Sequence, residues 1–346
     1  MHRQIQLVTE RQKELYIMGG SALKNTQTRR YDRDEYLRIA NLVTVKLSTL
    51  DNVYRAYPIP HIRDKQTFGD LDILYTTWSD AAVRRDSIQR MFEPNEIVKN
   101  GDVISFNVEE LQVDAIHSLF SPSNYALKYF SWNDAGNLCG KLFHKFGLKH
   151  GHKGLVLPLR DGNNHFEDVH LTFNHDDALK FVGLDPEIYN DGFDTLDDLF
   201  KYVASSPYYN PDFYKLENLN TIAKVRDRKR TTYNKFLAFG ESYVGPRYTG
   251  FSEDKSVYLQ RIFDAFPHAY EQFEQANARL ATQKFLKQKF NGDLVKELTG
   301  LSGKQLGAFM RHLREQFDFK ESVLLYLSEA TIRKNVLDMF ETFNDN

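Results

Sequence analysis

Two aspartates, Asp70 and Asp72, stand two residues apart in a short apolar stretch that ends at Tyr75. The alternation of side chains predicts a β-strand with Leu71 and Ile73 on one face and both carboxylates on the other. Like charges this close repel each other, so the strand either faces water or presents the pair to a cation. Paired carboxylate oxygens suit Mg²⁺ or Mn²⁺. A plain solvent-facing strand is the competing interpretation.

A third carboxylate, Asp114, lies in a second short apolar stretch, where it alternates with Val113 and Ala115. If the two strands are neighbours, Asp114 joins Asp70 and Asp72 on one patch. Three carboxylates are what a two-metal phosphoryl-transfer site requires, because one metal activates the attacking hydroxyl and the other neutralises the triphosphate. We therefore predict that these three aspartates are the catalytic residues and the metal ligands.

The composition narrows the class of protein. The chain has 346 residues, 41% hydrophobic and 27% charged, which suits two or three globular domains. The net charge of −2 requires any nucleic-acid surface to be local. The single cysteine, Cys139, excludes a disulfide framework and a thiolate-rich zinc site. Without a membrane-length apolar run or a signal-peptide core, we expect a cytoplasmic protein with no membrane partner, in a bacterium or a phage-infected host.

Periodicity divides the chain into an α+β front part and a mainly helical C-terminal half. The expected helices of the front part are 32–50 and 79–91, and its expected strands are 96–98, 103–108 and 111–117. Farther along we expect helices at 124–130 and 135–146, a strand at 155–159, a polar loop at 161–170, acidic helices over 176–204, one long helix over 216–239, and helices at 256–290, 293–300, 303–316 and 321–342.

Four blocks follow one another over about residues 15–160: a Gly-Gly-Ser turn that ends at Ser21, the strand with Asp70 and Asp72, the strand with Asp114, and the stretch Tyr129–Asn137. In this order they resemble the nucleotidyltransferase fold of the DNA polymerase β superfamily, with the best match to family X DNA polymerases. The resemblance implies a palm domain with a mixed sheet at 1–120, a thumb-like subdomain at 121–170 that contacts nucleotide and nucleic acid, and a helical C-terminal part at 171–346.

The same resemblance implies roles for single residues. Asp70 and Asp72 would bind both metal ions, and Asp114 would bind the catalytic metal and help to deprotonate the attacking hydroxyl. The residues expected to bind the nucleotide are Gly20, Ser21, Lys24, Tyr129, Phe130, Asp134 and Asn137. Gly20 and Ser21 would hold the terminal phosphates, as the exposed amides after a strand can do.

Two basic stretches are candidates for contact with nucleic acid. The first, residues 141–153, contains Lys141 and Lys145 among several histidines, and we interpret it as a basic surface rather than a zinc site. Lys141 also falls where the family often has a template-contacting arginine. In the second stretch, Arg226 and Arg230 lie four residues apart on the expected long helix, where like charges repel and an anionic partner would relieve them.

The chain also departs from the family. Residues 22–68 separate the Gly-Ser and Asp-x-Asp blocks, a far longer interval than the family has, which predicts an insertion at about 25–65. Trp132 and Asn133 replace the serine and glycine of the family's sugar-binding turn. Only some eighteen residues precede Gly19, so the family's N-terminal lyase and DNA-binding domains have no counterpart here.

The C-terminal stretch Phe290–Gly307 weakly resembles the tails of CCA-adding enzymes and poly(A) polymerases. It predicts two short helices joined at 300–303, which could hold a phosphate backbone or simply pack together.

These features predict an enzyme that uses two Mg²⁺ or Mn²⁺ ions to transfer a nucleoside monophosphate from an NTP or dNTP to a hydroxyl, most simply a 3′ end of DNA or RNA. Three alternatives stay open: an enzyme that extends tRNA or other RNA ends, a transferase that modifies a protein or small molecule as toxin-type enzymes do, and an inactive nucleic-acid-binding protein. The sequence does not select ribo- or deoxyribonucleotides, a template, or an oligomeric state.

Overall fold

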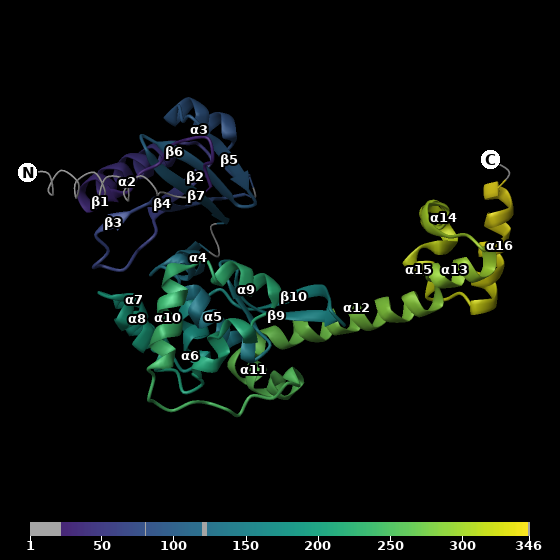
Figure 1. The fold of residues 1–346 in the computed structure, drawn as a ribbon. Helices are drawn as coiled ribbons and strands as arrows, with labels where there is room; N and C mark the ends of the chain where they lie inside the picture. Colours follow the sequence, from purple (N-terminus) through teal and green to yellow (C-terminus); the bar gives the residue numbers. More distant parts are fainter. Residues whose placement is uncertain (1–21, 80, 120–122, 345–346) are drawn as a thin grey trace, which may run out of the picture. The chain divides into compact units, whose positions relative to one another are not determined.

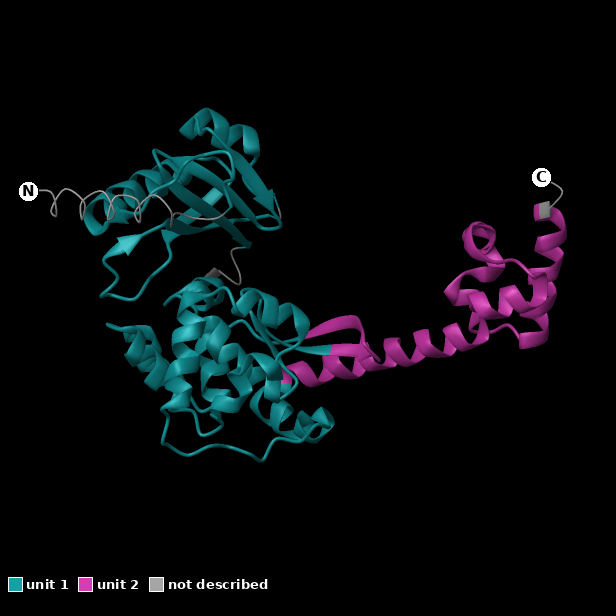
Figure 2. Cartoon of the chain, viewed as in Figure 1, with its two compact units in different colours: residues 1–158, 170–267 teal, residues 159–169, 268–346 magenta. Residues whose placement is uncertain are grey.

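The computed structural model describes residues 22–79, 81–119 and 123–344 (Figure 1). It falls into two compact units, Met1–Pro158 with His170–Pro267 and Leu159–Val169 with His268–Asn346 (Figure 2). In the described residues, no helix combines the length and the apolar character that crossing a membrane requires. The first unit contains the aspartate strands, and we call residues 22–119 its sheet lobe and residues 123–158 with 170–267 its helical lobe.

The sheet lobe is built on a five-stranded mixed sheet with the order β2-β4-β7-β6-β5. The strands are β2 (Val53–Pro58), β4 (Asp70–Thr77), β5 (Ile97–Asn100), β6 (Val103–Val108) and β7 (Leu111–Leu119). The central pair, β4 and β7, runs parallel, and every other neighbouring pair in this sheet is antiparallel. This confirms the predicted α+β class with a mixed sheet. The short strands β1 (Tyr31–Asp32) and β3 (Thr67–Phe68) form a separate two-stranded sheet.

Helix α2 (Arg33–Ser48) covers one face of this sheet and confirms the helix predicted over 32–50. It begins at a capping box in which the Asp32 side chain accepts from the Glu35 amide. Its apolar stripe packs into one core with the buried side chains of β4 and β7, among them Ile39, Val43, Leu71, Ile73 and Val113. Because the segment 25–65 supplies both α2 and β2, it is part of the sheet lobe's core rather than a surface addition.

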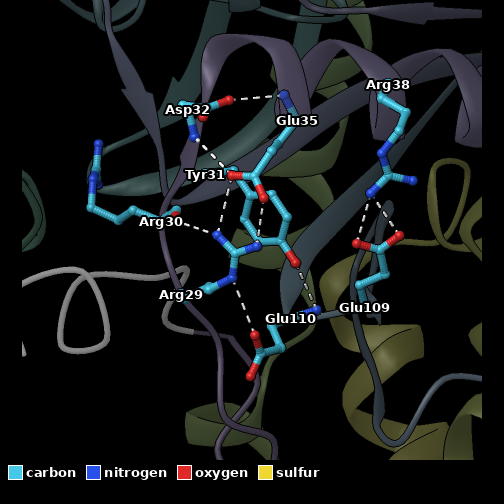
Figure 3. Close-up of polar contacts among 8 residues, drawn as sticks. All are labelled: Arg29, Arg30, Tyr31, Asp32, Glu35, Arg38, Glu109 and Glu110. Atoms are coloured by element: carbon cyan, nitrogen blue, oxygen red, sulfur yellow. Dashed lines mark hydrogen bonds and ion pairs between the residues drawn. The ribbon is translucent and has the colours of Figure 1, made fainter. Parts of the chain in front are cut away.

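Arg29 ties the start of this segment to the turn between β6 and β7 (Figure 3). Its guanidinium binds Glu35 Oε1 at 2.7 Å and Glu110 Oε2 at 3.2 Å, and it stacks 3.7 Å from the centre of the Tyr31 ring. The Arg29 amide also donates to the Glu110 carbonyl at 2.9 Å. The hydrogen bonds that Arg29 donates to Glu35 are the main reason that the pKa of Arg29 is raised.

The remaining helices of the first unit are α3 (Arg85–Phe92), α4 (Ser123–Phe130), α5 (Ala135–Lys145), α6 (His175–Phe181), α7 (Pro186–Asp191), α8 (Leu196–Ala204), α9 (Thr221–Asp227), α10 (Thr231–Glu241) and α11 (Leu259–Ala265). Helix α3 begins later than the helix predicted over 79–91. The predicted helices at 124–130 and 135–146 are confirmed by α4 and α5.

The predictions for residues 161–170 and 216–239 are wrong, and the helix predicted over 321–342 is interrupted after Leu324. Residues 161–170 are not a polar loop, because β10 (Asn164–Thr172) continues a sheet with β9 (Gly154–Asp161) and β8 (Lys149–Gly151). The single helix expected over 216–239 is interrupted after Asp227, and α10 starts only at Thr231. Asn220 caps α9 by accepting a hydrogen bond from the Ala223 amide, so a new helix starts there instead of continuing from Leu216.

The second unit contains α12 (Tyr270–Lys289), α13 (Gly292–Thr299), α14 (Gly303–Glu315), α15 (Glu321–Leu324) and α16 (Glu329–Asn344). The pair of short helices predicted around 300–303 is confirmed as α13 and α14, with Gly300 at φ 72° as the left-handed cap. The buried Val295 and Phe309 place the two helices in the core of this unit. The packing of these side chains therefore accounts for the helix pair.

Candidate active site

The three aspartates predicted to act together lie on the two central strands of the sheet. In the parallel register of β4 and β7, Asp72 stands opposite Asp114 and Asp70 stands opposite Gln112. Strand alternation puts the three carboxylates on one face, whereas Leu71 and Val113 point to the opposite face and are fully buried. The prediction that the two strands are neighbours is confirmed.

A cavity of about 350 Å³ opens on the face that carries the carboxylates. Its walls are formed by Tyr36, Ile59, Pro60, His61, Lys65, Asp70, Asp72, Ile116, Phe130, Asn133, Asp134 and Arg230. The structure therefore brings Phe130, Asp134 and Arg230 from the helical lobe to the same cavity as Asp70 and Asp72. A hydrogen bond of 2.8 Å from the Trp132 amide to the Pro60 carbonyl joins the two lobes beside it.

Burial by protein atoms and repulsion between like charges disfavour the ionised form of these carboxylates. The Asp72 side chain is exposed to the cavity, but the protein atoms around it raise its pKa to about 8, with contributions from Asp70 and Asp114. Burial and Asp70 also raise the pKa of Asp114, against hydrogen bonds from Ser105 and Gln112. A bound cation would remove this repulsion, so the site is electrostatically suited to one.

The charge of Lys65 on the cavity wall lowers the pKa of Asp72, but most of that repulsion stays in place. Burial lowers the pKa of Lys65 despite the opposing influence of Asp70 and Asp72, and burial likewise lowers the pKa of His61. The Arg230 guanidinium is already bound to the Asp134 carboxylate. No ion pair within the described residues joins any of these three cations to Asp70 or Asp72.

The carboxylates suit a divalent metal in chemistry and position, but they do not form a complete set of metal ligands in this conformation. Within the described ranges, no three His, Cys, Asp or Glu side chains stand close enough together to hold an ion. Asp114 is turned toward Gln112, whose Nε2 donates to both carboxylate oxygens at 3.0 Å. To bind an ion together with Asp70 and Asp72, Asp114 would have to exchange this amide for the metal.

Two residues of the predicted phosphate-binding turn, Gly20 and Ser21, lie outside the described residues. The next two residues are anchored beside Asp114, since the amides of Ala22 and Leu23 donate to Gln112 Oε1 at 2.9 and 3.3 Å. The predicted nucleotide contact Lys24 does not line the cavity. Its side chain is exposed, and its amide donates to Glu96 Oε1 at 3.2 Å.

The Tyr-Phe pair is split by the structure. Phe130 lines the cavity and stacks on His152 with ring centres 5.4 Å apart. Tyr129 does not line it, and packs against His150 with ring centres 5.1 Å apart. The expected role at the sugar therefore fits Phe130 better than Tyr129.

The turn between α4 and α5 has an unusual backbone. Trp132 and Asn133 both have left-handed φ angles, 61° and 60°, which is rare for a bulky residue such as tryptophan. These are the positions where the resemblance implied serine and glycine. The Trp132 ring packs against Phe193, and Asn133 lines the cavity wall.

Asp227 is a buried carboxylate near the cavity residues that the sequence did not reveal. It is fully buried and accepts hydrogen bonds from Lys141 Nζ at 2.8 Å, Arg226 Nε at 2.7 Å and Asn137 Nδ2 at 3.3 Å. Burial alone would raise its pKa, but the hydrogen bonds from Arg226 and Lys141 outweigh burial and lower it. Three residues predicted to contact nucleotide or nucleic acid thus share one internal carboxylate. Asn137 and Lys141 reach it from 90 and 86 positions away, and Arg226 is its neighbour in sequence.

The structure supplies partners for the basic residues whose repulsion suggested an external polyanion. Arg226 and Arg230 do not lie on one continuous helix, because α9 ends at Asp227. Arg226 pairs with Asp227, and Arg230 pairs with Asp134. Lys145 lies 4.2 Å from the centre of the Phe213 ring. The argument from unrelieved repulsion therefore no longer supports a nucleic-acid contact at these residues.

The interpretation of residues 141–153 as a basic surface is wrong for His150. This side chain is buried in β8, its Nδ1 lies 2.6 Å from the Tyr125 hydroxyl, and burial lowers its pKa well below the usual value. His175 is its buried neighbour, with ring centres 5.4 Å apart. The polar and glycine residues of this stretch did not predict β8, the strand in which the His150 side chain is buried.

Comparison with known proteins adds no family to this picture. A search against protein-family models finds no model that matches the chain, and a search of curated proteins finds no match.

Proposed function

We propose that this protein is a nucleotidyltransferase that depends on Mg²⁺ or Mn²⁺ and moves a nucleoside monophosphate from an NTP or dNTP to a hydroxyl. The observation that carries the proposal is the parallel register of β4 and β7. It places Asp72 beside Asp114, with Asp70 on the same face at a cavity. Carboxylates that repel each other beside a cavity are costly to an isolated chain and suit a site that works with bound cations.

The residues divide the work as follows. Asp70, Asp72 and Asp114 would hold two metal ions, which would supply charge neutralisation and an activated hydroxyl when bound. Asp114 would also accept the proton of the attacking hydroxyl. Phe130, on the wall formed by the helical lobe, offers an apolar surface for the sugar or base. Positioning and charge neutralisation account for most of the catalysis in such a reaction.

For the acceptor, we propose a nucleic-acid 3′ end. Arg230 on the cavity wall has five N–H donors, and the contact to Asp134 leaves others for phosphate oxygens. Addition to tRNA or other RNA ends and transfer to a protein hydroxyl use the same chemistry at the metal ions. They differ in the acceptor and are separated by experiment.

The test is incubation with labelled NTPs or dNTPs, Mg²⁺ or Mn²⁺, and DNA, tRNA or protein acceptors in separate reactions. Asp70→Asn should reduce incorporation by about 10³-fold or more. It should leave the thermal unfolding temperature near that of the wild type. Asp51→Asn is the matched control, because Asp51 is an exposed turn residue of the same lobe that does not line the cavity.

Label in DNA or other nucleic acid supports the proposed acceptor, and label in tRNA alone or in protein alone redirects it. Retained incorporation by Asp70→Asn, or absence of label with the wild-type protein in every reaction, would refute the proposed function.

A further inference from the structure

The segment 25–65, which separates this chain from the family it resembles, forms much of the cavity wall. Five of the twelve lining residues belong to it: Tyr36, Ile59, Pro60, His61 and Lys65. Four of these are aromatic or apolar in part, and Lys65 alone carries a fixed positive charge. This segment therefore brings a lysine to the carboxylate site.

The backbone around Lys65 is held in place by two arginines. Arg33 Nη2 donates to the Lys65 carbonyl at 2.9 Å and also binds the Arg63 carbonyl. Arg30 donates to the Thr67 carbonyl at 2.6 Å and to its hydroxyl at 3.0 Å. These contacts fix the loop before β3, so the Lys65 side chain leaves from a defined position.

The ammonium group of Lys65 has no such commitment. Within the described part of the chain, its Nζ makes no hydrogen bond and no ion pair. It is attracted by the charges of Asp70 and Asp72 and lies 4.9 Å from the centre of the Phe68 ring. Phe68 is itself stacked on Tyr36 with ring centres 3.9 Å apart. An ammonium on an aromatic base, with three donors still to satisfy, is suited to an anionic ligand.

In the proposed function, the carboxylates of Asp70 and Asp72 beside Lys65 bind metal ions. If Asp70 and Asp72 neutralise metal ions, the positive charge of Lys65 is left without a counter-charge when the site is loaded. The other lysines near the site differ in this respect, since Lys141 is paired with Asp227. We propose that Lys65 binds a phosphate group of the substrate in this cavity, which deepens the proposed function and rests on it.

The phosphate has two possible sources with one chemistry, the triphosphate of the nucleotide and the phosphodiester next to an acceptor end. Equilibrium binding by calorimetry in Mg²⁺ separates them, with inorganic tripolyphosphate as one probe and a short single-stranded oligonucleotide as the other. Lys65→Met should weaken at least one probe by about 10-fold or more, because it removes a charge-assisted hydrogen bond. Lys65→Arg should restore most of the binding.

Lys99→Met is the matched control, because Lys99 is an exposed lysine on β5 of the same lobe and does not line the cavity. It should bind both probes as the wild type does. Thermal unfolding of all three variants checks that the loop still folds. Loss for tripolyphosphate alone assigns the nucleotide as the source, and loss for the oligonucleotide alone assigns the acceptor.

Unchanged binding of both probes by Lys65→Met would overturn the assignment, as would a wild-type protein that binds neither probe. Because binding is measured without turnover, the two proposals fail separately. Binding that depends on Lys65 in a protein that transfers no label contradicts the proposed function only. Transfer by the wild type with unchanged binding by Lys65→Met contradicts the Lys65 assignment only.

Discussion

Asp227 in the helical lobe and Asp72 in the sheet lobe show two opposite treatments of a negative charge. Asp227 is fully buried and accepts hydrogen bonds from two cations, so its pKa is lowered. Asp72 faces a cavity beside two further carboxylates, and its pKa is raised to about 8. The charge of Asp227 is balanced by cations of the chain itself. The charge of Asp72 has no ion-pair partner among the described residues.

The contrast separates structural from functional charge better than burial does. A folded chain pairs the charges that it buries for stability, because an unpaired buried charge is strongly destabilising. Carboxylates left to repel each other persist where a ligand relieves them, which is why perturbed groups in a cavity point to a site. The two aspartates should therefore respond in opposite directions to neutral substitution.

The largest effect is expected at Asp227. Asp227→Ala leaves Lys141 and Arg226 without their shared counter-charge and should lower the free energy of unfolding by about 3–5 kcal/mol. Chemical denaturation at pH 7 measures this change. Asp197→Ala is the control, because its ion pair with Lys201 lies on the surface and is worth about 0.5 kcal/mol or less. If the two variants unfold alike, the Asp227 network does not stabilise the lobe.

Local alternation made the sheet side of this comparison predictable. Leu71 and Ile73 alternate with Asp70 and Asp72, so one strand determines both the buried face and the charged face. Helix α2 was predictable for the same reason, because its apolar residues recur at helical spacing. The strand β10 was not, since its exposed and half-buried residues alternate too weakly to mark a face.

The helical side depends on contacts that are distant in sequence. Asp227 and Asn137 meet across 90 positions, and nothing near Asp227 distinguishes it from the other charges of its stretch. The interruption after Asp227 has no glycine or proline to announce it. Lys65 was missed for the same reason, because a lysine in a polar loop shows its neighbours only when the loop is folded.

The buried histidines are a third case, in which the titratable side chain stays uncharged. His175 is buried, both its ring nitrogens lack a hydrogen-bond partner among the described residues, and burial followed by the charge of Lys128 lowers its pKa to about 3. Since the unfolded chain protonates near pH 6.5, the unfolded state gains protons first as the pH falls. Stability should therefore decrease from pH 6.5 downward, by about 2 kcal/mol at pH 5.

His175→Phe should flatten this acid dependence, because it removes the titrating group and loses no hydrogen bond. Urea denaturation at pH 8 and pH 5 gives the two values for each protein. His165→Phe is the control, because this histidine is exposed at a sheet edge beside Asp168. An equally steep loss of stability in His175→Phe would show that other groups cause the acid sensitivity.

The smallest and most specific effect is expected at Asp72. Its folded pKa lies above the unfolded value of about 4, so the folded state holds the extra proton between pH 4 and about 8. The free energy of unfolding should fall as the pH rises through that window in the absence of metal. Asp72→Asn removes the titration and should be more stable than the wild type at pH 8, by about 1 kcal/mol after allowance for solvent screening.

Below about pH 3, where Asp72 is protonated in both states, the two proteins should unfold alike. Added Mg²⁺ should stabilise the wild type at pH 8 and narrow its difference from Asp72→Asn, because an ion that binds only the folded state shifts the equilibrium toward it. A lower stability of Asp72→Asn at pH 8 would mean that the carboxylate is already satisfied within the chain, as Asp227 is. The carboxylate face would then be a structural feature, and the contrast on which the proposed site rests would disappear.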